Sequence, residues 1–236
     1  MKASVSCLGS ILFSLALVSP RAQGQFEHPD LKSGKVVVHK LLILPPQVGI
    51  TKSGMKGNEG MPEEEGVVEN ALPSLISKAL QAKGCAVLDD VLTPAALSKN
   101  EELKSSVADI WGKFKTIEPH VAQKPKDIRT GRYTMGDDVA NFAPGAAVDA
   151  LVFAVAEGRL TTGGKKTFDA LVAGPGARED LIVMNIYLVD SQSGNVLLLT
   201  DAAAGGNFVA DPSHMAKPIG KSFKDFACSQ SSTKPK

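Results

Sequence analysis

The chain has 236 residues, 43% of them hydrophobic, and its 26 basic and 25 acidic side chains give a formal net charge of +1 at pH 7. This composition is ample for one hydrophobic core and for at most two small domains. A charge so evenly balanced lacks the electrostatic signature of proteins that bind nucleic acid or anionic membranes, so neither class is expected.

The first 24 residues predict a cleavable secretory signal peptide. Lys2 provides the positive start, residues 8–18 form a short apolar and small-residue run, and Ala22 and Gly24 place small residues at the −3 and −1 positions. A membrane span would need about 20 apolar residues. Cys7 precedes the run, whereas a lipid-modified cysteine follows it. We therefore expect cleavage after Gly24, a mature chain without a transmembrane segment, and a periplasmic or extracellular location.

Cleavage would leave 24 basic and 25 acidic side chains and two cysteines, Cys85 and Cys228. In an oxidising compartment these two could form one disulfide that ties the C-terminal tail to the second predicted strand. Alternatively, they are two small buried thiols that never meet, because spacing alone cannot place their Cα atoms within bonding distance. Both alternatives remain open at this stage.

The first part of the mature chain predicts a leader, a strand and a loop. Residues 25–34 are polar, contain a proline and a glycine, and predict a flexible leader. Residues 35–44 are strongly β-forming and apolar on both faces, which is typical of a strand inside a covered sheet. Pro45–Pro46 end this strand. Residues 47–61 contain three glycines and no periodicity, so they predict a loop.

Two amphipathic helices follow, with a short strand between them. The first runs from Pro62 to Gly84, with three glutamates in its first turn, and Pro73 should kink or split it. Residues 85–88 predict the short strand. The second helix runs from the Asn100 cap to Pro119, which should end it. Its apolar face includes Trp111, which indicates a core residue.

The last part of the chain predicts three strands and a helix. The strands cover residues 147–156, 181–189 and 196–200, and the turn-rich segment between the last two predicts a hairpin. A final helix starts at Asp211–Pro212, and residues 229–236 predict a disordered tail. The order β-α-β-α-β-β-β-α predicts a single α/β domain over residues 35–228, with a mixed sheet of about five strands and helices packed on it.

No catalytic, metal-binding or cofactor-binding constellation stands out. The four histidines, at positions 28, 39, 120 and 214, have no metal-ligand spacing to other histidines, cysteines or acids. Asp137–Asp138 is typical of the start of a short helix, and Asp149 and Asp190 are typical of turns and caps at strand edges. We therefore expect no enzymatic activity, no metal and no cofactor; a hydrolase with an unfamiliar site is a distant alternative.

Two loops have residues suited to binding. The segment 158–167 resembles a phosphate-binding loop, but an extra glycine and a second lysine shift the register and no helix with a clear pattern follows, which argues against a nucleotide. It continues into apolar residues, unusual for a solvated connection, and is therefore predicted to be an interaction loop. Its candidate contact residues are Gly163, Gly164, Lys165, Lys166, Phe168 and Leu171. The basic segment 124–132 predicts a solvated loop, and contact with an acidic partner is the alternative.

Several short motifs resemble a known group of envelope domains. They are the strand 36–46 that ends in prolines, the helix that ends at Lys83–Gly84, the Ala-Val-Asp-Ala-Leu-Val-Phe strand at 147–153, and the hairpin at 188–197. In these features the chain resembles the envelope α/β domains of the TolB N-terminal type and of the curli secretion lipoprotein CsgG. The resemblance implies an α/β scaffold that assembles envelope complexes without catalysis. The chain lacks their lipid attachment site, β-propeller and membrane hairpins, so only the scaffold and the general role carry over.

The leading prediction is thus an exported, non-enzymatic protein-interaction or assembly domain of the bacterial cell envelope. Its expected partners are other envelope proteins and not nucleic acid. The alternative is a ligand- or anion-binding module that uses the glycine-rich 158–167 loop. The sequence leaves the partner's identity and the oligomeric state open.

Overall fold

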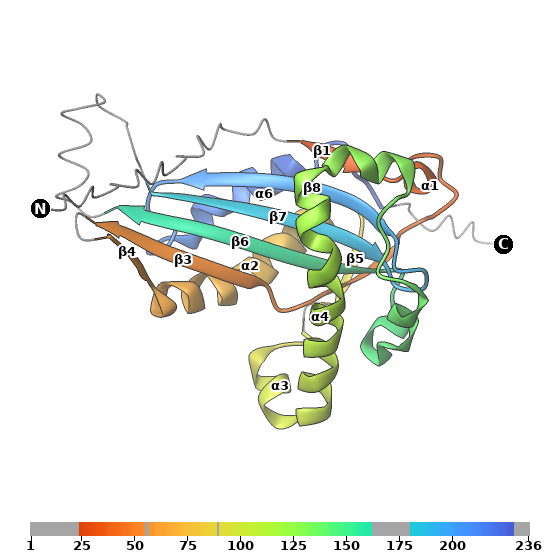
Figure 1. Ribbon diagram of the computed structural model, residues 1–236, viewed down its shortest axis with the longest axis horizontal. Coiled ribbons are helices and arrows are strands. Elements are labelled where there is room, and N and C mark those ends of the chain that lie inside the picture. Colours follow the sequence, from red (N-terminus) through yellow and green to blue (C-terminus); the bar gives the residue numbers. More distant parts are fainter. Residues whose placement is uncertain (1–23, 55–56, 89, 162–179, 229–236) are drawn as a thin grey trace, which may run out of the picture.

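The structure is a computed structural model that describes residues 24–54, 57–88, 90–161 and 180–228. These residues form one mixed sheet of eight strands with helices on both faces (Figure 1). The α/β fold class predicted from the sequence is confirmed, although the sheet has eight strands rather than about five. The predicted signal peptide, apart from Gly24, and the predicted tail lie outside the described residues.

Six strands form the main line of the sheet, in the order β1 (Gln25–Glu27), β8 (Val196–Gly205), β7 (Leu181–Asp190), β6 (Ala150–Thr161), β2 (Lys40–Ile43) and β5 (Ala86–Leu88). β3 (Gln47–Gly54) continues beyond β2 along the same side of β6 and pairs outward with β4 (Gly57–Gly60). β2 is parallel to both of its neighbours, and β3 is parallel to β6. The remaining pairs are antiparallel.

Helices cover the two faces of this sheet. The helices are α1 (Pro29–Lys32), α2 (Pro62–Gln81), α3 (Pro94–Lys99), α4 (Glu101–Gln123) and α6 (Ala216–Ser222), and short 3-10 turns are η1 (Pro125–Thr130), η2 (Asp137–Asn141), η3 (Ala143–Ala147) and η4 (Pro212–Met215). The side chain of Asn100 accepts a hydrogen bond from the Leu103 N–H, so the predicted cap of α4 is confirmed. Pro73 lies within α2, and Pro119 lies within α4 rather than ending it.

One apolar cluster lies between the sheet and the α2–α6 side. Its fully buried members include Leu41, Leu72, Ile76, Val152 and Ile219. This arrangement explains why the first predicted strand is apolar on both faces: alternate side chains of β2 enter this cluster and the one on the opposite face.

The second cluster lies under α4 and is rich in aromatic residues. Phe114 stacks on Phe153 with ring centroids 4.2 Å apart and meets Tyr187 edge-on at 4.9 Å. Trp111 packs edge-on against Phe153, and its Nε1 donates a hydrogen bond to the Pro45 carbonyl at 3.1 Å. The prediction that Trp111 is a core residue is confirmed, and its indole N–H also holds the proline turn between β2 and β3 in place.

Two segments predicted to lack regular structure form strands. Residues 25–34, expected to be a flexible leader, form β1 and α1, and the Phe26 side chain packs against the α4-side cluster. Residues 47–61, expected to be a loop, contain β3 and β4, and Ile50 in β3 is fully buried. β1 and β3 are specified by partners distant in the sequence, β8 and β6, rather than by their own composition, and β4 forms by pairing with β3.

A disulfide joins Cys85 to Cys228, with an S–S distance of 2.06 Å and Cα atoms 5.1 Å apart. The Cys228 N–H also donates to the Lys83 carbonyl at 3.1 Å. Of the two alternatives for these cysteines, the structure contains the bonded one. The chain beyond α6 is thereby attached to the turn between α2 and β5.

Candidate functional site

The predicted interaction loop cannot be placed. Gly163, Gly164, Lys165, Lys166, Phe168 and Leu171 lie outside the described residues, between the end of β6 and the start of β7. The alternative places an anion-binding loop at residues 158–167; residues 158–161 form the end of β6 instead of a loop, and for the other residues the alternative stays a prediction.

The acidic residues considered as alternatives for chemistry have structural partners. Asp149 Oδ2 accepts the N–H groups of His39 and Lys40 at 2.7 and 2.8 Å, which ties the start of β6 to the start of β2. Asp190 Oδ1 accepts N–H bonds from Gln192 and Ser193 at 3.0 and 2.7 Å and so shapes the β7–β8 hairpin. Both residues therefore form the turns and caps that the sequence predicted.

The described part of the chain contains neither a metal-binding cluster nor a membrane-spanning helix. No group of three or more histidine, cysteine, aspartate or glutamate side chains there could hold a metal ion. None of the helices in the described ranges combines the length and the apolar character that a membrane crossing requires.

The feature best suited to binding is the edge of the sheet at β1, where no other strand of the described residues pairs with it. The His28 N–H donates to the Leu197 carbonyl at 2.8 Å, and β1 is antiparallel to β8. Because hydrogen bonding alternates along an antiparallel strand, the backbone groups of Phe26 also face β8. The backbone N–H and C=O groups of Gln25 and Glu27 therefore face away from the sheet, where a further strand could pair with them.

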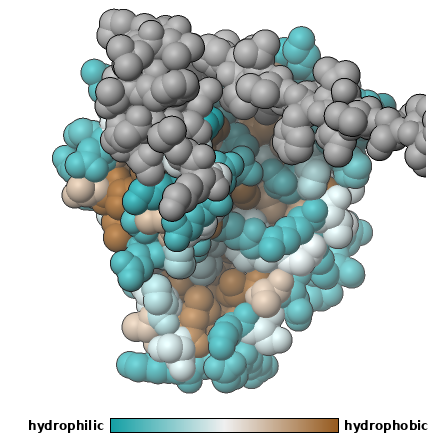
Figure 2. Space-filling model, turned by 60° about the vertical axis from the view of Figure 1, so that its left-hand side comes forward, coloured by the Kyte–Doolittle hydropathy of each residue, from teal (hydrophilic) through white to brown (hydrophobic). Residues whose placement is uncertain are grey.

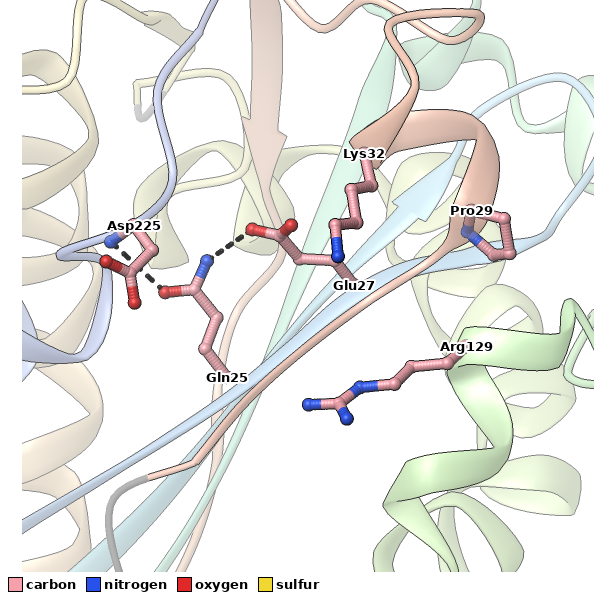
Figure 3. A pocket seen from close by; sticks show the side chains of 6 residues that line it. All are labelled: Gln25, Glu27, Pro29, Lys32, Arg129 and Asp225. Atoms are coloured by element: carbon pink, nitrogen blue, oxygen red, sulfur yellow. Dashed lines mark hydrogen bonds between the residues drawn. The ribbon is translucent and has the colours of Figure 1, made fainter.

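This edge lies at the bottom of a groove. A hollow of about 390 Å³ runs beside β1 and is lined by Gln25, Glu27, Pro29, Lys32, Arg129 and Asp225 (Figure 3). A second hollow of about 420 Å³ shares Gln25 and Asp225 with the first and adds Gly24, Thr200, Lys221, Ser222 and Lys224. We call these two adjoining hollows the β1 groove.

The two walls of the β1 groove differ in chemistry. On one side the Gln25 Nε2 donates to Glu27 Oε1 at 2.6 Å, and the Asp225 N–H donates to Gln25 Oε1 at 3.3 Å. Figure 3 shows Arg129 reaching toward β1 from the opposite side to Asp225. The Arg129 guanidinium lies 5.5 Å from the centre of the Phe26 ring, a cation–π contact. One wall is thus an amide–carboxylate network and the other a cation on an aromatic ring.

The opposite edge of the sheet is built differently. Here β5 pairs with β2, and β4 pairs with β3. The chain between β2 and β3 passes through Pro45 and Pro46, which have no N–H to offer a further strand. A hollow of about 240 Å³ at this point is lined largely by apolar residues and prolines from the end of β2, from α2 and from residues 92–94. Figure 2 likewise shows apolar side chains recessed between polar ones on one side of the molecule.

The ionised form of one carboxyl group beside this hollow, that of Glu69, is disfavoured. Burial, and to a lesser extent the nearby Glu65 carboxylate, raises the pKa of Glu69 above its ordinary value. Glu65 itself accepts the Ile50 N–H at 2.9 Å, so it is held beside β3. The Glu69 carboxylate is therefore a cost to the folded chain at neutral pH rather than part of a stabilising ion pair.

Sequence reasoning missed the β1 groove except for one part. The basic 124–132 segment, with contact to an acidic partner as an alternative, contains Arg129. The residues Gln25 and Glu27 were assigned to a flexible leader. The polar-apolar-polar order Gln-Phe-Glu at 25–27 has the two-residue period of a strand, but three residues are too few for that signal to be recognised.

No protein-family model matches the sequence, and no curated protein matches it at a significant level. Among solved structures, a PelC dodecamer from Paraburkholderia phytofirmans aligns with a TM-score of 0.41 and 13% identity, over 89% of this chain and 99% of that chain. A variant of that PelC dodecamer aligns with a TM-score of 0.39 and 15% identity, over 86% and 95% of the two chains. Lipoprotein GNA1162 from Neisseria meningitidis aligns with a TM-score of 0.34 and 11% identity, over 70% and 81%. Similarity at this level carries no information on what this chain binds, and the resemblance to TolB-type and CsgG domains stays a prediction.

Proposed function

We propose that this chain is an exported, non-enzymatic protein-interaction domain of the bacterial cell envelope, and that it binds an extended segment of a partner protein as an added strand beside β1. The observation that carries the proposal is the outward-facing backbone of Glu27 and the outward-facing Gln25 carbonyl at the bottom of the β1 groove; after cleavage at Gly24 the Gln25 nitrogen is the α-ammonium of the mature chain. Main-chain hydrogen bonds to a free sheet edge are an established way to bind an extended peptide.

Access through the β1 groove supports this choice of site. Proteins protect exposed edges with prolines, short strands and charges, because an open edge pairs readily with other chains. The edge at β4 and β5 has prolines at the point where neither strand covers it. The edge strands β1, β4 and β5 are all short and contain no proline, and β1 is the one that lies beside the β1 groove.

The β1 groove also favours a single extended segment over a second copy of the domain. The strand lies between two walls, one formed by Asp225 and one by Arg129 (Figure 3). A second copy would have to bring its own β1, recessed between the same two walls, into contact with the first. A flexible segment from a partner meets no such obstruction.

Two further features support export. The predicted signal peptide ends at Gly24, and β1 begins at the next residue, Gln25. The Cys85–Cys228 disulfide is a bond that persists in oxidising compartments and is rare in the cytosol of most organisms. Both are as expected for a protein that works outside the cytoplasm.

The test uses a proline that removes one outward N–H. In Glu27→Pro the lost N–H points away from β8, so we expect the fold to be retained, whereas Phe26→Pro would remove a bond to β8 and destabilise the domain by about 1–3 kcal/mol. A photoreactive side chain at Lys32, at the end of the β1 groove, should crosslink a partner in an envelope fraction.

The matched control is Glu27→Ala, which removes the carboxylate and keeps the N–H. We expect the crosslinked product to persist in Glu27→Ala and to disappear in Glu27→Pro, with thermal unfolding confirming that both variants are folded. If no crosslinked product forms, or if it forms equally well in a folded Glu27→Pro protein, strand addition at β1 is wrong.

A further inference from the structure

We infer that the segment received beside β1 is acidic, and that it presents a carboxylate to Arg129 on the Phe26 side of the β1 groove. This inference rests on the proposed strand addition and specifies the chemistry of the partner. It follows from the charges that line the β1 groove and from the alternation of side chains along a strand.

The charges of the β1 groove are unequal. Its two hollows are lined by four basic residues, Lys32, Arg129, Lys221 and Lys224, and by two acidic ones, Glu27 and Asp225. Asp225 lies 3.7 Å from the Lys224 ammonium, whereas Glu27 accepts a hydrogen bond from the neutral Gln25 amide and keeps its negative charge. Over the described ranges, Lys32, Arg129 and Lys221 form no ion pair. The uncompensated charge of the β1 groove is therefore positive.

The alternation of side chains along β1 indicates which position of the partner segment carries the acidic residue. Residues directly opposite each other in paired strands lie on the same face of the sheet. The partner residue opposite Phe26 therefore faces the wall that carries Arg129, and the residues opposite Gln25 and Glu27 face the Asp225 wall. An acid opposite Phe26 would meet a guanidinium that has no other anion and is already oriented by the aromatic ring.

A basic segment fits less well. A lysine or arginine opposite Phe26 would be placed beside Arg129 with no anion between them. On the other wall it would compete for Glu27 and Asp225, which are already engaged. Like charges in such proximity weaken binding and so help to exclude a basic segment.

The experiment selects peptides from a displayed library of random short extended sequences against the wild-type exported protein. We expect the selected peptides to be enriched in aspartate and glutamate at alternate positions. Arg129→Gln should weaken their binding roughly tenfold and should reduce its dependence on salt, because the charge that the salt screens has been removed. Arg129→Lys should restore much of both.

The control variant is Arg132→Gln. Arg132 lies three residues away and is paired with Asp127 at 2.7 Å, so its removal should leave peptide binding unchanged. Selected peptides that bind wild type but not Glu27→Pro, and that are not acidic or ignore Arg129→Gln, would overturn the acidic-partner inference and leave strand addition standing. Failure to select any peptide, or binding that is equal in Glu27→Pro, would overturn both.

Discussion

Replacing both Cys85 and Cys228 by alanine removes the disulfide that joins the start of β5 to the chain beyond α6. The two cysteines are 143 residues apart, and the loop-closure model gives about 5 kcal/mol of stabilisation at about 25 °C for a loop of this length. Removal of native disulfides from secreted domains costs about 2–5 kcal/mol. The Cys228 N–H bond to the Lys83 carbonyl should persist in the variant, so the native geometry is retained. We expect the free energy of unfolding to fall by about 4 kcal/mol. Most of this loss arises because the unfolded chain gains conformational entropy when the disulfide is absent.

Urea unfolding followed by tryptophan fluorescence measures this loss. Trp111 is the only tryptophan, and it is buried under α4, so its emission reports the opening of the core. The free energy of unfolding should fall, and its urea dependence should rise, because the unfolded chain without the link exposes more surface. Reductant should lower the stability of wild type to that of the variant and leave the variant unchanged. A loss below about 1 kcal/mol, or a variant that still responds to reductant, would refute the loop-closure reasoning.

Three further predictions concern single side chains. Asp149→Ala leaves two backbone N–H groups at the start of β2 without their acceptor and should lower the free energy of unfolding by about 1.5–3 kcal/mol, measured by urea titration. Phe114→Ala empties a fully buried aromatic site and should cost about 3–5 kcal/mol, with loss of near-ultraviolet dichroism; a cost below about 1 kcal/mol would contradict the packing described. Burial, and then Glu65, raise the pKa of Glu69, so its contribution to stability is lost as the pH rises through that pKa. Glu69→Gln should therefore raise the melting temperature at neutral pH and give no gain below about pH 4, and an equal gain at both values would exclude the charge as the cause.

The parts of the fold that were predictable are those whose signal is local. The apolar runs of β2, β6, β7 and β8 and the stripes of α2 and α4 are repeated over many residues, so each predicts its element without knowledge of a partner. The hairpin at Asp190 was predictable because an aspartate that accepts nearby N–H groups makes its own turn. Pro119 did not end α4. The helix continues to Gln123, because burial of Val121 in the core stabilises its last turn.

The candidate site lacked such a local signal. β1 has only three residues, and its edge is defined by pairing with Thr200, Leu199 and Leu198 near the other end of the chain. The position of Arg129 over Phe26 depends on how η1 packs beside the sheet, which no spacing in the sequence expresses. A site assembled from three distant segments becomes visible only when the topology is known.

The pairing of the first strand with the last has a consequence for the order in which the protein is assembled. A polypeptide is synthesised from its amino end, so Gln25 is made 175 residues before its neighbour Thr200, and the disulfide partner Cys228 is made later still. The interior strands β2 and β6 can already associate during that interval, whereas the amino-terminal strand must wait. The groove beside β1 therefore forms only in a finished molecule, so a partial product cannot capture a partner through it.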